Sequence, residues 1–301
     1  WNREYRVFTR EGHPVGAPDA PPIIGRSATI SPDGQRLIAV VPTERGLATH
    51  LLDATGALIR SLASVPTEAY DTSWSGDGER VAIITPHRLD VFNRDGEPIA
   101  SLDAPGDRLG KPALAPDGSR IAFVRVPGDA GQTPRTELWT MEDSTPSTLA
   151  IPSDFPQAVS FSPDSEFMYV RLWGQPTLYV TRNGVEVGRI TSPDDMLSDP
   201  ILSPDGSKFL LTTRTTVSIH APDGSRIGAP IAHGSGWVDS ACFAPDGESI
   251  HSASYHRGTI EQRDLSGKLL SRASIGTSMH YVACTPDGLV LAALLNDFSD
   301  I

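Results

Sequence analysis

A short turn-forming tetrad recurs along this chain at a nearly constant interval, and it limits the possible folds more than any other feature. Each copy is Ser-Pro-Asp-Gly or a near relative, and the copies begin at Ser31, Ser75, Ala115, Ser162, Ser203, Ala244 and Thr285. Their aspartates, at positions 33, 77, 117, 164, 205, 246 and 287, are separated by 44, 40, 47, 41, 41 and 41 residues. Seven units at this period indicate a repeat architecture.

Each tetrad is flanked by apolar residues and therefore predicts a β-hairpin. In the third unit, for example, Ala113 and Leu114 precede the tetrad and Ile121 follows it. Proline presets φ for the turn, aspartate caps it, and glycine supplies the positive φ that reverses the chain. A second turn follows about 20 residues later in most units, with copies at 53–56, 94–96, 182–184, 223–224 and 266–267. The unit is thus predicted to contain four strands, A to D, as in a propeller blade.

The two ends of the chain each contain part of a repeat unit, and the two parts are predicted to complete one another. Arg10-Glu11-Gly12 matches the turn between strands C and D, whereas the last tetrad is followed by one apolar strand within Leu289–Leu295. The predicted fold is an all-β, seven-bladed β-propeller with four antiparallel strands per blade, forming a single domain over residues 1–301. Residues 1–18 would supply strands C and D of the last blade, and residues from about 277 to 301 would supply strands A and B. Such closure removes exposed sheet edges.

Composition narrows the class of partner. The formal net charge of −12 disfavours nucleic acid, and no apolar run is long enough to span a membrane. Because the sequence begins at Trp1 without a signal segment, we interpret it as a fragment or processed product, with a cytoplasmic location expected and a periplasmic one left open. The two cysteines, Cys242 and Cys284, lie one register apart relative to their tetrads, and we expect them to be free buried thiols.

The sixth unit, IAHGSGWVDSACFAPDGESIHSASYHRGTIEQRDLSGKLL, resembles the WD-repeat family. Asp264 stands where the aspartate of the family's Trp-Asp pair would be, but Arg263 replaces the tryptophan and His256 lies near the position of the family's buried aspartate. The residues that match the family pattern are His233, Trp237, Val238, Phe243, Pro245, Asp246 and Gly247.

Two groups of propellers share this degenerate pattern. The segments FTREGHPVGAP and HAPDGSRIGAPIAHG are similar to rim turns in the WD-repeat regions of large bacterial signalling proteins of the STAND type. That resemblance implies a recognition or scaffold module, a sensor or docking region beside an effector domain of the same parent chain. Periplasmic Tol-type propellers are the alternative for the fold subtype. The alternative for function is the propeller domain of a multidomain hydrolase similar to prolyl oligopeptidase.

No catalytic motif is present in the sequence. It lacks the Gly-x-Ser-x-Gly elbow, the phosphate-binding loop, His-Glu-x-x-His and Cys-x-x-Cys. Ser235 lies between two glycines, but its expected position is the loop between strands D and A, and we interpret His233 as a structural residue below that loop. We therefore predict a protein that is not an enzyme and that needs no cofactor or metal.

The remaining candidate site is the face formed by the loops between strands D and A and between strands B and C. Variable loops on a rigid frame are where specificity usually lies, and arginine and aromatic residues are enriched at interface hot spots. We expect a protein or peptide partner there, including other domains of the parent chain, and neither nucleic acid nor a membrane. The candidate partner-binding residues are Arg26, Tyr70, Arg125, Arg171, Trp173, Arg214, Trp237, Asp239, Tyr255 and His280.

Overall fold

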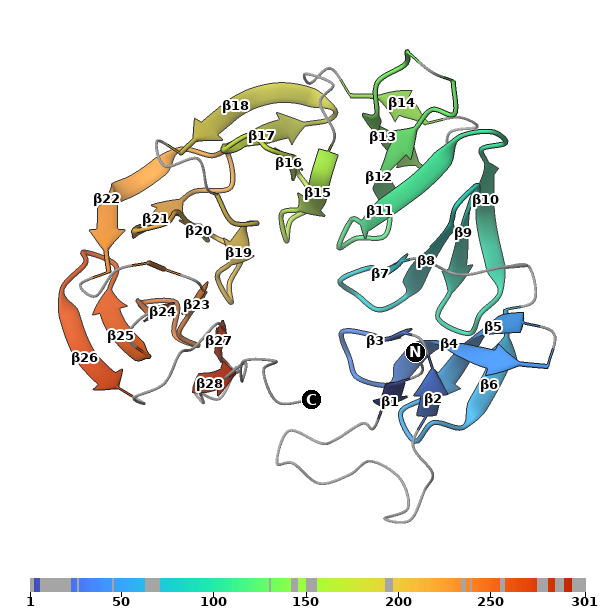
Figure 1. Ribbon diagram of the computed structural model, residues 1–301, viewed down its shortest axis with the longest axis horizontal. Coiled ribbons are helices and arrows are strands. Elements are labelled where there is room, and N and C mark those ends of the chain that lie inside the picture. Colours follow the sequence, from blue (N-terminus) through green and yellow to red (C-terminus); the bar gives the residue numbers. More distant parts are fainter. Residues whose placement is uncertain are drawn as a thin grey trace, which may run out of the picture. The chain divides into compact units, whose positions relative to one another are not determined.

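The computed structural model (Figure 1) describes residues 3–5, 23–25, 27–44, 46–62, 71–129, 131–141, 146–149, 156–192, 197–233, 237–238, 240–254, 258–274, 281–284 and 290–293. The chain divides into two compact units, Trp1–Ser165 and Glu166–Ile301. No helix that could cross a membrane is found in the described part of the chain.

The described strands form six four-stranded sheets and two short hairpins, and all the register pairs are antiparallel. Sheet 1 contains β3 (Ser27–Ile30), β4 (Arg36–Thr43), β5 (Gly46–Asp53) and β6 (Leu58–Ser61). Sheet 2 contains β7 (Asp71–Trp74), β8 (Arg80–Thr85), β9 (Arg88–Asn93) and β10 (Pro98–Asp103). Sheet 3 contains β11 (Arg108–Leu114), β12 (Arg120–Val126), β13 (Arg135–Thr140) and β14 (Ser147–Thr148).

The later sheets repeat this order. Sheet 4 contains β15 (Pro156–Phe161), β16 (Phe167–Leu172), β17 (Thr177–Arg182) and β18 (Val185–Thr191). Sheet 5 contains β19 (Ile201–Leu202), β20 (Phe209–Thr212), β21 (Thr216–His220) and β22 (Arg226–Ala232). Sheet 6 contains β23 (Ser240–Phe243), β24 (Ser249–Ser254), β25 (Thr259–Asp264) and β26 (Leu269–Ser274).

The predicted four-stranded unit is confirmed in these six sheets, whose strands pair in chain order. At the ends of the chain, β1 (Arg3–Tyr5) pairs with β2 (Ile23–Gly25), and β27 (Tyr281–Cys284) pairs with β28 (Val290–Ala293), as two separate two-stranded sheets. No pairing between the two hairpins is present among the described residues. The predicted seventh blade, which would join residues 1–18 to residues from about 277 onward, falls mostly on residues outside the described part.

The six described tetrads form the turns between the first and second strands of their sheets, as predicted. At the first copy, the Gly34 amide donates to the Ser31 carbonyl at 2.9 Å, and the Ser31 hydroxyl donates to Asp33 Oδ1 at 2.6 Å. Asp33 also accepts from the Gln35 amide at 3.0 Å. The last tetrad residue has positive φ at all six described copies, Gly34, Gly78, Gly118, Ser165, Gly206 and Gly247. The serine at the fourth copy therefore adopts the same turn as the glycines.

The turns between the third and fourth strands pack against the third and fourth strands of the preceding sheet. A Cβ added at Gly224, whose φ is +88°, would lie 2.9 Å from Val180 Cγ2 and 3.7 Å from Ile190 Cδ1 of sheet 4. At Gly267, an added Cβ would lie 3.5 Å from Ile231 Cγ1 of sheet 5. At Gly224 the close approach and the positive φ both favour glycine, whereas at Gly267, whose φ is +91°, the positive φ alone does so.

The apolar core consists of clusters that join neighbouring sheets within each unit. In the first unit, Ile84, Leu89 and Val91 of sheet 2 pack with Phe123 and Trp139 of sheet 3. In the second unit, residues of β20 and β21 pack with residues of β23 and β24, including Leu210, Val217, Ile219, Phe243 and Ile250. The sheets thus bury their faces against one another, as propeller blades do.

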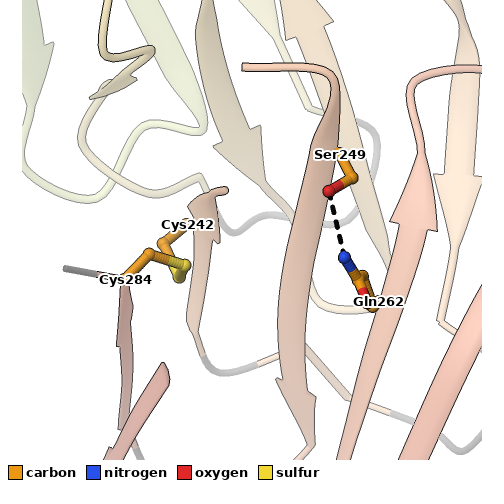
Figure 2. The surroundings of a disulfide bond; sticks show 4 residues. All are labelled: Cys242, Ser249, Gln262 and Cys284. Atoms are coloured by element: carbon orange, nitrogen blue, oxygen red, sulfur yellow. Dashed lines mark hydrogen bonds between the residues drawn. A yellow bond between two sulfur atoms is a disulfide. The ribbon is translucent and has the colours of Figure 1, made fainter. Parts of the chain in front are cut away.

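The two cysteines form a disulfide, so the expectation of free thiols is wrong. Cys242 on β23 and Cys284 on β27 are bonded, with Cα atoms 5.8 Å apart (Figure 2). In the sequence, the two cysteines are offset by one register relative to their tetrads. The structure shows that neighbouring first strands are themselves offset by one register, which brings the two side chains together.

Candidate functional site

The structure describes five of the ten predicted partner-binding residues, and they differ strongly in exposure. Arg125 and Arg171 are mostly covered, with 13% and 17% of the side chain exposed, whereas Trp173 is 68% exposed and Trp237 is 42% exposed. Arg214 is also exposed. The other five, Arg26, Tyr70, Asp239, Tyr255 and His280, lie outside the described residues.

In the first unit, Arg125 is a structural bridge between a strand and a loop. It lies near the end of β12, and its guanidinium donates to Glu137 Oε2 on β13 at 2.9 Å and to Asp107 Oδ2 at 3.1 Å. Asp107 belongs to the loop that leads from sheet 2 into sheet 3. The hydrogen bond from Arg125 is the main reason that the pKa of Asp107 is lowered. Arg125 therefore fixes the loop and has little charge left to offer a partner.

Arg171 has a similar positioning role in the second unit. Its Nε donates to Asp199 Oδ1 at 2.7 Å, so the end of β16 is tied to the loop that leads into β19. The next anchor is Ser198, whose amide donates to the Thr212 carbonyl at 2.9 Å and whose hydroxyl accepts from the Thr212 amide at 2.9 Å. These bonds hold the loop 197–200 between the ends of β16 and β20.

Trp237 and Arg214 form an exposed pair in the second unit. The Arg214 Cζ lies 4.5 Å from the centroid of the Trp237 ring, a cation–π arrangement. The backbone supports this pair, because the Val238 amide donates to the Arg214 carbonyl at 2.8 Å and the His233 amide donates to the Thr215 carbonyl at 3.2 Å. We call the exposed residues Trp173, Arg214 and Trp237 the tryptophan surface; Trp173 follows β16, Arg214 follows β20, and Trp237 precedes β23. The Trp173 loop is closed by a bond from the Ser192 amide to the Pro176 carbonyl at 2.7 Å, and the loops of Arg214 and Trp237 are joined by the bonds given above.

Sequence reasoning missed a set of buried carboxylates at one register position. Asp90, Glu137 and Glu261 are each the third residue of the third strand of their sheet. Each pairs with the fourth residue of the second strand, and these partners are Ile83, Phe123 and Ser252 respectively. All three are at most 4% exposed and accept hydrogen bonds from an arginine two positions away on the same strand, namely Arg88, Arg135 and Arg263. The spacing Arg-x-acid or acid-x-Arg was visible in the sequence at 88–90, 135–137 and 261–263, but the sequence alone does not show that these acids are buried.

Glu261 has the largest set of partners. Its Oε2 accepts from Arg263 Nε at 3.0 Å, and its Oε1 accepts from Arg272 Nε at 3.0 Å. The imidazole of His233 lies 3.9 Å from Oε2, with its side chain fully buried. Burial is the main cause of the lowered pKa of His233, and Glu261 opposes it. This cluster thus explains Arg263, which replaces the family tryptophan: it neutralises a buried acid.

The described residues show no arrangement typical of a metal centre. No group of three or more histidine, cysteine, aspartate or glutamate side chains that could hold a metal ion is found among them. Ser235, the serine between two glycines, lies outside the described residues, so the structure does not test its position.

The comparisons with known proteins identify the fold. The structure is similar to the crystal structure of the C-terminal WD40 domain of Sif2, with a TM-score of 0.60 and 15% identity over 90% of this chain and 79% of that chain. It is also similar to the β-propeller domain of Cps50 (Swd1) of Myceliophteria thermophila, with a TM-score of 0.57 and 12% identity over 88% of this chain and 91% of that chain. No protein-family model and no curated protein matches the sequence. The chain therefore has the WD-repeat β-propeller fold, which the sequence predicted.

Proposed function

We propose that this chain is a non-enzymatic protein-recognition or scaffold module that binds a protein or peptide partner through the tryptophan surface. The observation that carries the proposal is the exposure of Trp173 and Trp237 on loops held by hydrogen bonds. Large exposed aromatic side chains on rigid loops are favourable anchors, because little conformational entropy is lost when they are covered. The WD40 fold supports the proposal, since such propellers typically bind protein partners.

The five described candidates divide into two roles in this proposal. Trp173, Arg214 and Trp237 contact the partner, whereas Arg125 and Arg171 position the loops through Asp107 and Asp199. The five candidates outside the described residues remain predicted partner-binding residues: Arg26, Tyr70, Asp239, Tyr255 and His280. We further propose that the partner belongs to a bacterial signalling protein, most simply another domain of the same parent chain.

Substitution of the tryptophans tests the function. A photo-crosslinking residue next to Trp173 captures the candidate partner, and the dissociation constant of the purified pair is then measured for Trp173→Ala and Trp237→Ala. We expect each change to weaken binding by about 30-fold, roughly 2 kcal/mol, which is the level of a hot spot.

Two control variants make this test specific. Val187→Ala removes an apolar side chain that is 52% exposed on β18, and Lys208→Glu reverses a charge beside a tetrad turn. Both should change the dissociation constant by less than about threefold, as expected of residues outside a hot spot. The proposal fails if the controls weaken binding as much as the tryptophan variants. Hydrolysis of a peptide, ester, phosphate or glycoside that one substitution abolishes would contradict the non-enzymatic assignment.

We propose, in addition, that the propeller has seven blades and that residues 1–18 complete the last one. The support comes from one position on β26, the fourth strand of sheet 6, which is exposed although its counterparts on β18 and β22 are partly or fully buried. On β18 and β22 this position is occupied by Ile190 and Ile231, which lie next to the turn glycines Gly224 and Gly267 of the following sheets. On β26 it is occupied by Ala273, which pairs with Ile260 as the two isoleucines pair with the second residue of their own third strands. The predicted turn Arg10-Glu11-Gly12 would cover this strand. Deletion of residues 1–18 should lower the melting temperature by several degrees, and an unchanged melting temperature would contradict closure.

A further inference from the structure

The Cys242–Cys284 disulfide joins the last complete sheet to the hairpin that follows it. Cys242 lies on β23 of sheet 6, and Cys284 is the last residue of β27, separated by 42 positions in the sequence. Both cysteines of the chain are used in this bond. Figure 2 shows the two side chains meeting between the neighbouring strands.

An equivalent contact in the first unit shows what the disulfide replaces. Ser73 on β7 and Leu114 on β11 are placed as the cysteines are, four and three residues before the aspartates of successive tetrads. There, the Leu114 amide donates a hydrogen bond to Ser73 Oγ at 3.0 Å. Neighbouring first strands therefore meet at this register, and the second unit has a covalent bond where the first has a hydrogen bond.

The described apolar residues that pack around the disulfide belong to sheet 6 and to Cys284 itself. Among the described residues, the cluster at this position contains Cys242 and Ala253, with Ile260 and Cys284 packed against it. In addition, β27 and β28 pair as two strands of four residues each, and an isolated two-stranded hairpin is marginally stable in water. A covalent link to sheet 6 therefore stabilises a hairpin that two paired strands alone would leave marginal.

We propose that the Cys242–Cys284 bond holds the β27–β28 hairpin to sheet 6 under redox control and that the chain matures in an oxidising compartment. Disulfides persist in such compartments and are rare in the cytosol. Formation begins when one cysteine thiolate attacks a low-molecular-weight disulfide, which releases one thiol and leaves a mixed disulfide on the protein. The second thiolate then displaces the other thiol. The protein loses two protons and two electrons, and the oxidant is reduced to two thiols.

Hydrogen exchange of the folded protein tests this proposal. Protection of the amides in Tyr281–Cys284 and Val290–Ala293 is measured before and after reduction with a phosphine, with β12 and β13 as the internal reference. We expect exchange of the hairpin to become at least about tenfold faster on reduction while the reference strands stay protected. Oxidised glutathione should restore the protection.

A cysteine-free variant and a thiol assay provide the controls. In Cys242→Ala/Cys284→Ala, the hairpin should exchange rapidly, and the reductant should have no further effect. Because the wild-type protein is reduced after folding, the test does not depend on this variant folding. The proposal is overturned if reduction leaves hairpin exchange unchanged. It is also overturned if the chain, isolated from its natural host with thiols blocked at lysis, carries two alkylated cysteines.

Discussion

The tetrad turns and the third position of the third strands both place carboxylates at regular intervals, but in opposite environments. At the turns, aspartate is partly or fully exposed and accepts hydrogen bonds from a nearby hydroxyl and from the backbone, as Asp33 and Asp205 do. These bonds lower the pKa of both side chains. At the strand position, Asp90, Glu137 and Glu261 are buried and accept from arginine.

The difference shows which of the two kinds of carboxylate site is formed by residues close together in the sequence. A turn aspartate finds its partners within two residues of the chain, so the bond from the backbone amide two positions later recurs at Asp33, Asp77, Asp117, Asp205 and Asp246. A buried carboxylate needs a counter-charge, and its cost depends on everything that excludes water from it. Sheet 4 shows this freedom, since Tyr179 takes the equivalent position and Arg189 lies over its ring at 5.4 Å.

The largest effect is expected from neutralising the buried acid. Glu261→Gln leaves the Arg263 and Arg272 guanidinium groups without their counter-charge, and we expect it to lower the free energy of unfolding by about 2–3 kcal/mol. This lies below the usual range for a broken buried ion pair because Arg272 is 47% exposed and can reach water. Urea denaturation followed by circular dichroism measures the change.

Glu166→Gln is the matched control for this substitution. Glu166 makes an ion pair with Arg182 at 3.0 Å, and both side chains are about half exposed. Surface ion pairs contribute little, so this variant should change the free energy of unfolding by less than about 1 kcal/mol. Equal effects of the two variants would show that burial does not distinguish the two kinds of carboxylate site.

A smaller effect on the free energy of unfolding is expected at the tetrad turns, where the backbone conformation selects the residue type. Gly34→Ala introduces a Cβ at φ +71° with no heavy atom within 4 Å, so the cost is conformational and should be about 1 kcal/mol. Gly110→Ala is the matched control, because its added Cβ is equally free of contacts and its φ lies outside the left-handed region. Chemical denaturation should find the Gly110 variant within about 0.5 kcal/mol of the wild type. If both variants are equally unstable, positive φ is not what selects glycine in the tetrad.

The candidate site was predicted less completely than the fold. Sequence reasoning treated Arg125 and Arg171 as free cations because it could not locate their partners, Asp107 and Asp199, which lie 18 and 28 residues away. The same limitation explains the disulfide. The one-register offset of Cys242 and Cys284 was visible, but its meaning depends on how neighbouring first strands are staggered. The exposure of Trp173 and Trp237 was consistent with their predicted loops.

The sequence by itself determined the four-stranded unit, its turns and the propeller class, because turn residues and alternating apolar strands act over a few residues and recur in each unit. The tertiary structure decided which charges are neutralised and which side chains meet. Glu261, for example, takes its arginines from its own strand and from β26, and its burial comes from the packing of sheet 6. The interactions of these groups are long-range along the chain, and water exclusion depends on every packed neighbour, so no local pattern encodes them.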